Sequence, residues 1–449
     1  MRITLIEPSR HLAGGPLLKA RSLVFAPVTL PLVAALTPPE HDVRIVIETL
    51  EDVAFSDRPD IVGLTATTAR AFRAYEIADE FRRRGVHVAM GGVHASAVPG
   101  EALQHADTVF VGEAEETWPR FLADFARRSH QRVYQSVERP SLDRLPVPRY
   151  SLLDPGRYLL WRTKGLARVL PLPVQCVQTA RGCPHDCEYC VVTEFHGRHF
   201  RPRPVPQVID ELKALGARSY FFLDDNIFAS PARARELLRA LAPMKLAWMG
   251  QCTLGAANDP ELIRLARESG CVILFVGIES LSQASLDASG KRINRVADYE
   301  RQLRVFREEH ISVFAAMMFG FDGEGTPAFR LTRDFLVRNR VAYSVWHPLL
   351  PLPGTRLHQR LGAEGRLKRP DWWLDPEMVA SFASLKFVDE TIDEDEFARE
   401  FARCYRSLYS LLNIARRILW PPRGRCVAQA VVNLALRRRV RSGGSVLEH

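Results

Sequence analysis

Three cysteines close together in the middle of the chain constrain it more than any other feature. Cys183, Cys187 and Cys190 have the spacing C-x3-C-x2-C. Cysteine thiolates are the usual ligands of iron–sulfur clusters, so three of them at this spacing can hold three irons of a four-iron cubane. No fourth cysteine continues the pattern, which leaves one iron open to a ligand from outside the protein. We therefore predict a [4Fe-4S] cluster on these three residues.

Two other uses of cysteine fit this chain less well. Zinc sites usually need four ligands, often as two C-x2-C pairs, and no second pair follows downstream. A disulfide framework is typical of small secreted domains, whereas this chain has 449 residues, 8 Cys and no expected secretory signal. Free cysteine is usually a small buried hydrophobe, and we expect that of the scattered Cys176, Cys252, Cys271, Cys404 and Cys426.

The run from Arg181 to Cys190, with its aromatic Tyr189, resembles the cluster loop of the radical S-adenosylmethionine (SAM) superfamily. The resemblance implies that the open iron chelates the amino and carboxylate groups of SAM, and that Tyr189 flanks the adenine. It also implies that reduction of the cluster cleaves SAM to a 5′-deoxyadenosyl radical, which removes a hydrogen atom from the substrate. The electron would come from a donor such as flavodoxin or ferredoxin.

The first 130 residues alternate apolar stretches with helical patterns, as in a doubly wound parallel α/β sheet. The expected strands are 2–7, 43–48, 61–66, 86–91 and 108–112. Such sheets bind ligands at the carboxyl ends of their strands. Three of these ends carry small or polar residues, and paired glycines allow a ligand to approach the backbone closely. The candidate residues are Thr65, Thr67, Gly91, Gly92, Gly112 and Glu113.

With the runs GGVHASAVPGEAL and VFVGEAEETW, this segment resembles the cobalamin-binding-like domain found before many radical SAM domains. The resemblance implies that the six candidate residues contact cobalamin. The loop after the first strand lacks the Asp-x-His-x-x-Gly motif whose His ligates cobalt in classical cobalamin proteins, and His11 is not in such a motif. We expect cobalamin to be held without a protein His on cobalt. A domain that has lost the cofactor is the alternative.

Strand and helix patterns repeat again from residue 174, and six βα units predict an open partial barrel. The expected strands are 174–179, 219–223, 246–251, 272–279, 313–319 and 342–347. Polar residues at the strand ends can bind the amino group and ribose hydroxyls of SAM by charge-assisted hydrogen bonds. We assign that role to Asp224, Asp225, Gln251 and Glu279; Asp224 and Asp225 resemble the family's amino-binding motif, and Glu279 its GIES position. Polar strand ends or helix caps are the alternative.

The expected organisation is therefore a cobalamin-binding-like domain at 1–130 and a connector rich in Pro and Arg at 131–172. A radical SAM barrel follows at 173–365, then a helical C-terminal region at 366–446 and, at 447–449, the sequence Leu-Glu-His, which resembles a tag remnant. The fold class is α/β. No run of 18 apolar residues is present, so we expect no transmembrane helix and a cytoplasmic protein.

The net charge of +9 is concentrated near the end of the sequence, where residues 416–441 contain eight Arg and no acidic residue. Basic residues around an apolar middle are typical of a helix that lies on a membrane surface. A terminal helix that docks on the protein and leaves its Arg side chains in water is the alternative. The first interpretation predicts peripheral membrane association and favours a hydrophobic or lipid-like substrate.

The function that these features favour is cobalamin-dependent methylation of an unactivated carbon in a small hydrophobic or natural-product-type molecule. The chain resembles the group that contains hopanoid methylases and the anaerobic cyclase of chlorophyll synthesis. Radical cyclisation, oxidation or rearrangement on the same scaffold, with or without cobalamin, is the alternative. RNA modification is disfavoured because residues 1–175 contain no Cys for a second cluster, so no nucleic acid partner is expected. A non-enzymatic iron–sulfur protein would leave the SAM residues without a purpose.

Overall fold

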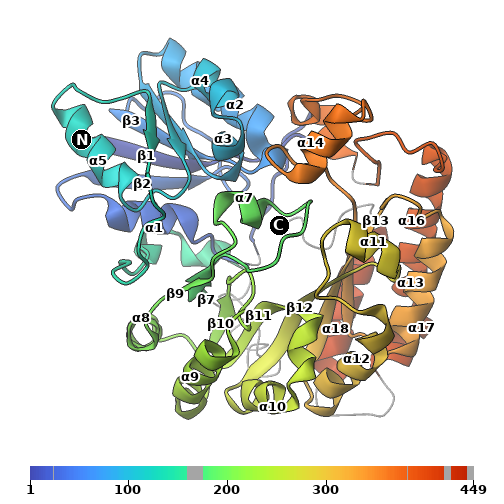
Figure 1. Cartoon of the computed structure of the whole chain (residues 1–449). Coiled ribbons are helices and arrows are strands. Elements are labelled where there is room, and N and C mark those ends of the chain that lie inside the picture. Colours follow the sequence, from blue (N-terminus) through green and yellow to red (C-terminus); the bar gives the residue numbers. More distant parts are fainter. Residues whose placement is uncertain (24, 159–174, 382, 419–425, 442–449) are drawn as a thin grey trace. The chain divides into compact units, whose positions relative to one another are not determined.

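The structure of the chain is a computed structural model that describes residues 1–23, 25–158, 175–381, 383–418 and 426–441. It divides into two compact units (Figure 1). Unit 1 contains the described residues up to 158 together with Cys190–Arg201 and Pro351–Ser381, and unit 2 contains the other described residues. The end of the expected connector, 159–172, and the expected tag, 447–449, lie outside the described residues.

Unit 1 is built on a parallel sheet with the strand order β2-β1-β3-β4-β5-β6. The strands are β1 (Arg2–Glu7), β2 (Asp42–Ile47), β3 (Ile61–Thr65), β4 (His87–Gly91), β5 (Thr108–Val111) and β6 (Val133–Gln135). The first five confirm the expected strands. The sixth lies in the segment expected to be a connector, where three residues are too short a run to stand out as a strand.

Five helices accompany this sheet: α1 (Thr29–Leu36), α2 (Ala71–Arg83), α3 (Val93–Ala97), α4 (Pro99–His105) and α5 (Thr117–Ala126). Helix α2 buries Ala71, Ala74, Ile77, Ala78 and Phe81, a spacing that places them on one face of the helix. The strand order is that of flavodoxin-like sheets, in which the order reverses between β1 and β3. Ligands of such sheets bind at that reversal, beyond the carboxyl ends of the strands.

Two segments that are distant in sequence complete unit 1, and they differ from the expected domain boundaries. One is Cys190–Arg201, with helix α7 (Val191–Phe195). The other is Pro351–Ser381, with α14 (Arg356–Ala363) and α15 (Pro376–Ala380). Trp372 and Trp373 of this segment belong to the hydrophobic core of unit 1. Trp373 also donates a hydrogen bond from its indole nitrogen to Glu101, at 3.0 Å.

Unit 2 contains a second parallel sheet, with the order β14-β13-β12-β11-β10-β7. Its strands confirm the six expected ones: β7 (Gln175–Val177), β10 (Ser219–Phe222), β11 (Ala247–Thr253), β12 (Cys271–Glu279), β13 (Ser312–Phe319) and β14 (Tyr343–Pro348). The helices between them are α8 (Val205–Leu215), α9 (Pro231–Leu241), α10 (Pro260–Glu268), α11 (Gln283–Ala288), α12 (Tyr299–Glu308) and α13 (Pro327–Arg338). Because β7 and β14 are the two edges, the sheet is an open partial barrel.

The two faces of this sheet differ in composition. On one face, Phe221, Phe275, Phe314 and Tyr343 form a continuous row, with successive ring centroids 5.5, 4.5 and 5.6 Å apart. On the other face, Trp346 packs against Tyr405 of a C-terminal helix, with ring centroids 5.1 Å apart. Side chains alternate between the two faces along a strand. A residue an even number of positions from one of these four rings on the same strand therefore lies on the same face as the row.

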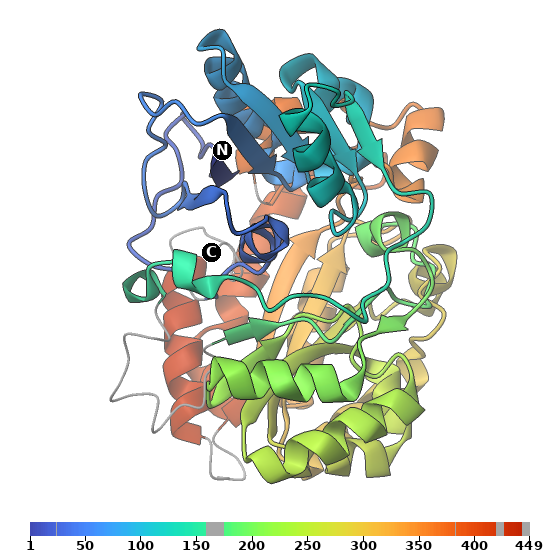
Figure 2. The same ribbon diagram turned by 90° about the vertical axis from the view of Figure 1, so that its left-hand side faces the viewer.

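The C-terminal region is helical, as expected, with α16 (Glu394–Leu408), α17 (Leu411–Ile418) and α18 (Cys426–Arg441); Figure 2 shows these helices in red. Asp393 caps α16 by accepting a hydrogen bond from the Glu396 amide at 2.6 Å. Arg417 is buried and donates to the carbonyls of Val341 and Ala342, at 3.1 and 2.9 Å. At least this one of the clustered arginines therefore fixes a helix to the sheet. None of the described helices is long and apolar enough to cross a membrane.

Candidate active site

The loop that carries the cysteines is held at its start by two acidic residues that follow β10. The carboxylate of Asp224 is 1% exposed and accepts hydrogen bonds from the amides of Thr179 and Ala180, at 2.6 and 3.1 Å, and from the Thr179 hydroxyl. Asp225 accepts a hydrogen bond from the Gly182 amide at 2.8 Å. These contacts fix the backbone immediately before Cys183.

The burial of Asp224 has an electrostatic cost. Removal from water raises the pKa of this carboxyl to about 6, and the hydrogen bonds from Thr179 and Ala180 only partly oppose the rise. Its oxygens are engaged by the chain's own backbone, so the contacts give Asp224 a structural role. The expected roles of Asp224 and Asp225 in binding SAM remain predictions.

The other side of the loop contacts the turn that ends α11. The Glu188 amide donates a hydrogen bond to the Ser289 carbonyl at 2.9 Å. Gly290 has a φ of +78°, and a Cβ atom there would lie 2.3 Å from the Asp186 carbonyl oxygen. Only glycine fits this conformation and this close approach without a shift of the loop.

The cysteine environment suits an anionic cluster. Cys187 is 6% exposed, and Cys183 and Cys190 are partly buried. Burial raises the pKa of the Cys183 and Cys187 thiols, while the positive charge of Lys291 acts in the opposite direction on both. The His185 amide donates to the sulfur of Cys183 and also favours the thiolate. Among the described residues no three His, Cys, Asp or Glu side chains converge as for one metal ion, but a cubane takes one thiolate per iron.

Glu279 and Lys291 form a buried ion pair on the cluster side of unit 2, with 3.3 Å between Nζ and Oε1. The β12–β13 register shifts between Gly277 and Glu279, and Glu279 has a φ of +69°. A non-glycine residue in this region at a bulge is a strained feature that is often found at functional sites. Burial raises the pKa of Glu279, and Lys291 opposes the rise. A Cβ at Gly277 would lie 2.2 Å from the Glu279 carboxylate, so this glycine makes room for the pair.

The remaining expected SAM residues are also in unit 2. Tyr189 contacts Phe321 edge-on, with ring centroids 6.1 Å apart. Gln251 is paired with Phe275 across β11 and β12, so it lies on the face with the row of four rings. His347 lies on the same face, four residues after Tyr343, and burial lowers its pKa to about 4. The sequence assigned no function to His347. It did not single out Lys291, because a lone Lys after a short helix has no diagnostic pattern.

In unit 1, the expected cobalamin residues lie at the carboxyl ends of β3, β4 and β5. Thr65 ends β3 and Thr67 is exposed just beyond it, while Gly91 ends β4. Gly92 has a φ of +96°, and a Cβ there would lie 2.8 Å from the Thr65 hydroxyl and 3.0 Å from the Ala66 carbonyl. Glycine therefore allows the ends of β3 and β4 to approach each other.

Gly112 and Glu113, after β5, differ in their surroundings. Gly112 has a φ of +86°, and no atom lies within 4 Å of its Cβ position, which leaves space for a ligand group. Glu113 is buried, lies 2.8 Å from His196 and pairs with Arg201. Its carboxylate thus binds the segment around α7, and its expected contact with cobalamin remains a prediction.

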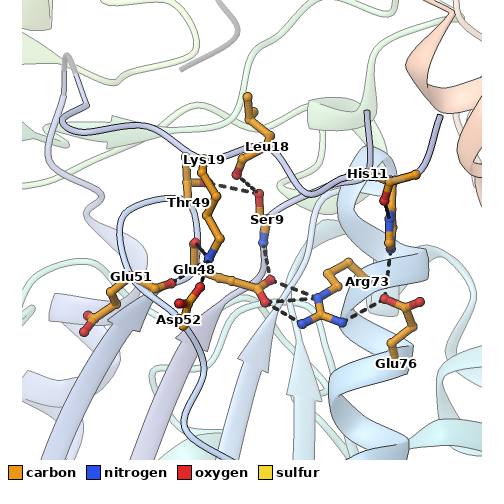
Figure 3. A network of polar contacts seen from close by, with 11 residues as sticks. Ser9, His11, Leu18, Lys19, Glu48, Thr49, Glu51, Asp52, Arg73 and Glu76 are labelled. Atoms are coloured by element: carbon orange, nitrogen blue, oxygen red, sulfur yellow. Dashed lines mark hydrogen bonds and ion pairs between the residues drawn. The ribbon is translucent and has the colours of Figure 1, made fainter. Parts of the chain in front are cut away.

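A polar network holds the loop that follows β1 (Figure 3). Glu48, 1% exposed at the end of β2, accepts a hydrogen bond from the Ser9 amide at 2.9 Å and pairs with Arg73 of α2 at 2.6 Å. Arg73 also contacts Glu76 at 2.9 Å. His11 has both ring nitrogens engaged, Nε2 with Glu76 at 2.9 Å and Nδ1 with the Gly15 carbonyl at 2.8 Å. No ring nitrogen of His11 is left over to bind a metal.

Comparison with known proteins supports both the expected radical SAM region and the expected cobalamin-binding region. A sequence model of the radical SAM superfamily matches residues 177–336, and a model of the B12 binding domain matches residues 34–122. The chain thus contains a radical SAM domain at 177–336 and a B12-binding domain at 34–122. Its cofactors are therefore a [4Fe-4S] cluster, SAM and cobalamin, and the expected resemblance, α/β fold class and cofactors are confirmed.

Two relatives and one solved structure illustrate the match. The bacteriochlorophyllide d C-12(1)-methyltransferase of Chlorobaculum tepidum is 29% identical over 89% of this chain and 86% of its own. The hopanoid C-2 methylase of Rhodopseudomonas palustris is 28% identical over 79% of this chain and 68% of its own. The structure of the cobalamin-dependent SAM radical enzyme OxsB, with aqua-cobalamin and SAM bound, covers 98% of this chain and 72% of that chain, with 14% identity and a TM-score of 0.69. This last likeness shows the fold.

The burial of Asp224 predicts a distinctive pH dependence of stability. Because its pKa is higher in the folded protein than in the unfolded chain, the folded state binds more protons between about pH 4 and pH 6. Its contribution to the free energy of unfolding therefore falls as pH rises through this window and is constant above it. Asp224→Asn keeps an oxygen for the two amides and does not ionise, so the variant should gain stability relative to wild type as pH rises from 4 to 7.5.

Urea unfolding of both proteins across this pH range measures the difference. Asp210→Asn, at an exposed position of α8, controls for the loss of one negative charge. A difference between Asp224→Asn and wild type that does not change with pH would show that this carboxyl is not the titrating group.

The engagement of both His11 nitrogens predicts that cobalt receives no imidazole from His11. His11→Ala should leave the stoichiometry of hydroxocobalamin binding and the visible spectrum of the bound cofactor unchanged. His130→Ala, at an exposed position of unit 1, is the matched control. Loss of a spectral feature in His11→Ala alone would mean that His11 leaves Glu76 and ligates cobalt.

Proposed function

We propose that this enzyme methylates an unactivated carbon of a small hydrophobic molecule. The observation that carries the proposal is the combination, in one chain, of a three-cysteine radical SAM loop with a B12-binding domain. Two relatives with broad coverage are named as carbon methylases, one of bacteriochlorophyllide d and one of hopanoids. These names favour methylation over the alternatives of cyclisation, oxidation and rearrangement, and they favour a bulky, apolar natural-product-type substrate.

The cofactors supply the reactive groups: SAM at the reduced cluster is the source of the radical that removes a hydrogen atom, and cobalamin is the source of the methyl group. The protein's own residues bind the substrate, orient it and exclude water from the site. The row Phe221, Phe275, Phe314 and Tyr343 gives one face of the unit 2 sheet an apolar base. Gln251 lies level with Phe275, and the Glu279–Lys291 pair provides charged groups at the carboxyl end of β12. An apolar base with a polar upper part suits a hydrophobic substrate beside a charged cofactor.

The test uses anaerobically reconstituted protein with SAM, hydroxocobalamin and a low-potential one-electron reductant. Wild type should hold four irons, bind one cobalamin and form 5′-deoxyadenosine. SAM with a deuterated methyl group should transfer its label to carbon when a bacteriochlorophyllide or a hopanoid is supplied as probe. Replacement of Cys183, Cys187 and Cys190 by Ala should abolish cluster absorbance and 5′-deoxyadenosine but leave cobalamin binding intact.

Two results would contradict this proposal in different ways. Full iron and sulfide content in the triple variant would remove the cluster assignment. Absence of stoichiometric cobalamin binding in wild type would remove methylation and leave cyclisation or rearrangement as the better interpretation.

We also propose that the C-terminal helices bind the surface of an anionic membrane. Val427, Val431 and Leu434 are 66%, 40% and 48% exposed and share one face of α18. The same face continues through the exposed Arg438 and Arg441. Apolar side chains beside cations match the boundary between acyl chains and anionic headgroups, where each Arg contributes about 1 kcal/mol. This contact would bring the enzyme to a lipid-soluble substrate.

Sedimentation with lipid vesicles tests the membrane proposal. Wild type should bind vesicles that contain phosphatidylglycerol and should not bind vesicles of phosphatidylcholine alone. The double substitution Val431→Ser and Leu434→Ser should weaken binding roughly tenfold or more, because two apolar side chains no longer enter the lipid. Leu331→Ser, 58% exposed on α13, is the matched control. Equal sedimentation with and without anionic lipid, or none with either, would contradict the proposal.

A further inference from the structure

The turn that ends α11 brings a lysine to the cluster loop within unit 2. Ser289 and Gly290 contact the loop directly, through the hydrogen bond from the Glu188 amide and the close approach of Gly290 to Asp186. A Cβ on Gly290 would also lie 3.6 Å from the Cα of Cys187. Lys291 is the next residue, so its backbone is placed beside a cluster ligand by contacts that involve no side chain of its own.

The side chain of Lys291 is buried in spite of its charge. It is 11% exposed, and its ammonium lies 3.3 Å from the Glu279 carboxylate and would be 3.1 Å from a Cβ on Gly277. Gly277 and Phe275 are on the same face of β12, so the ammonium lies on the face that carries the row of aromatic rings. A buried ammonium interacts with its neighbours more strongly than one in water because the local dielectric constant is lower.

The charges of Lys291 and Glu279 act on the cysteines in opposite directions. Lys291 lowers the pKa of both Cys183 and Cys187, against the larger effect of burial. Glu279 acts on Cys187 in the opposite sense and less strongly than Lys291. Asp186 acts on Cys187 and Asp225 acts on Cys183 in the same sense as Glu279, so the favourable charge at both sulfurs comes from Lys291.

We propose that Lys291 sets the reduction potential of the cluster and is a positioning residue, with no part in bond making. With three thiolate ligands, the cluster and its ligands carry a charge of −1 when the core is [4Fe-4S]²⁺ and −2 when it is [4Fe-4S]⁺. The one electron that makes the difference comes from a low-potential donor of the flavodoxin or ferredoxin class. A fixed cation favours the more negative state, so Lys291 raises the potential and makes this reduction easier. The inference rests on the proposed function only in requiring the cluster.

Potentiometric titration followed by the electron paramagnetic resonance signal of the reduced cluster tests the inference. It is done on full-length protein reconstituted without SAM or cobalamin, so that neither cofactor affects the result. Lys291→Met should have a lower midpoint potential than wild type, whereas Lys291→Arg should stay close to wild type. Lys213→Met, whose side chain is 66% exposed on α8, should not change the potential. Lys291→Met combined with Glu279→Gln should lie between Lys291→Met and wild type.

A second variant keeps the test decisive if Lys291→Met assembles less than four irons. Glu279→Gln removes the negative charge of Glu279 beside Lys291, and the potential should then rise above that of wild type. Unchanged potentials in Lys291→Met and Glu279→Gln overturn the inference, and so does a change in SAM affinity without a change in potential, which would assign Lys291 to SAM. Failure of wild type to assemble a cluster would instead contradict the proposed function.

Discussion

Two adjacent carboxylates hold the backbone on which the cluster loop depends. Asp224 accepts hydrogen bonds from Thr179 and Ala180, and Asp225 accepts one from Gly182. An ionised carboxylate that is removed from water is costly unless hydrogen bonds replace the lost solvent, and Asp224 meets that condition with donors from the loop itself. The hydrogen bonds that offset the desolvation of Asp224 are therefore the same bonds that order the loop. The direction in which Cys183 leaves the sheet is consequently set by acids that follow the neighbouring strand.

The same principle operates in unit 1, at the carboxyl end of β2. Glu48 is buried and is satisfied by Ser9 and Arg73, so the long loop after β1 is tied to the sheet and to α2. In both units, a buried carboxylate at a strand end orders a segment that comes from another strand. Parallel sheets favour this arrangement because all their strands end at one edge, where loops from different strands meet.

The fold was predictable where the pattern was long and local. The nine-residue apolar run of β12, Cys271–Glu279, and the capped helix α10 are signalled by residues close together in sequence. Strand β6 was missed because three residues carry little pattern. The assignment of Cys190–Arg201 and Pro351–Ser381 to unit 1 depends on contacts such as Trp373 with Glu101, and no local signal indicates which distant partner an indole will find. The cysteine spacing predicted the cluster site, but Asp224, chosen for SAM, is engaged by the loop, and Lys291 had no signature at all.

Gly277 and Gly290 have a joint consequence for how this site can change. Gly277 makes room for the head groups of Lys291 and Glu279, and Gly290 allows the turn that delivers Lys291 to lie against Asp186. A larger residue at either glycine displaces the Glu279 carboxylate, the lysine or the loop, whether or not position 291 is a lysine. Because the three positions are neighbours in space, the effects of substitutions at them on stability and on the reduction potential are expected to be non-additive.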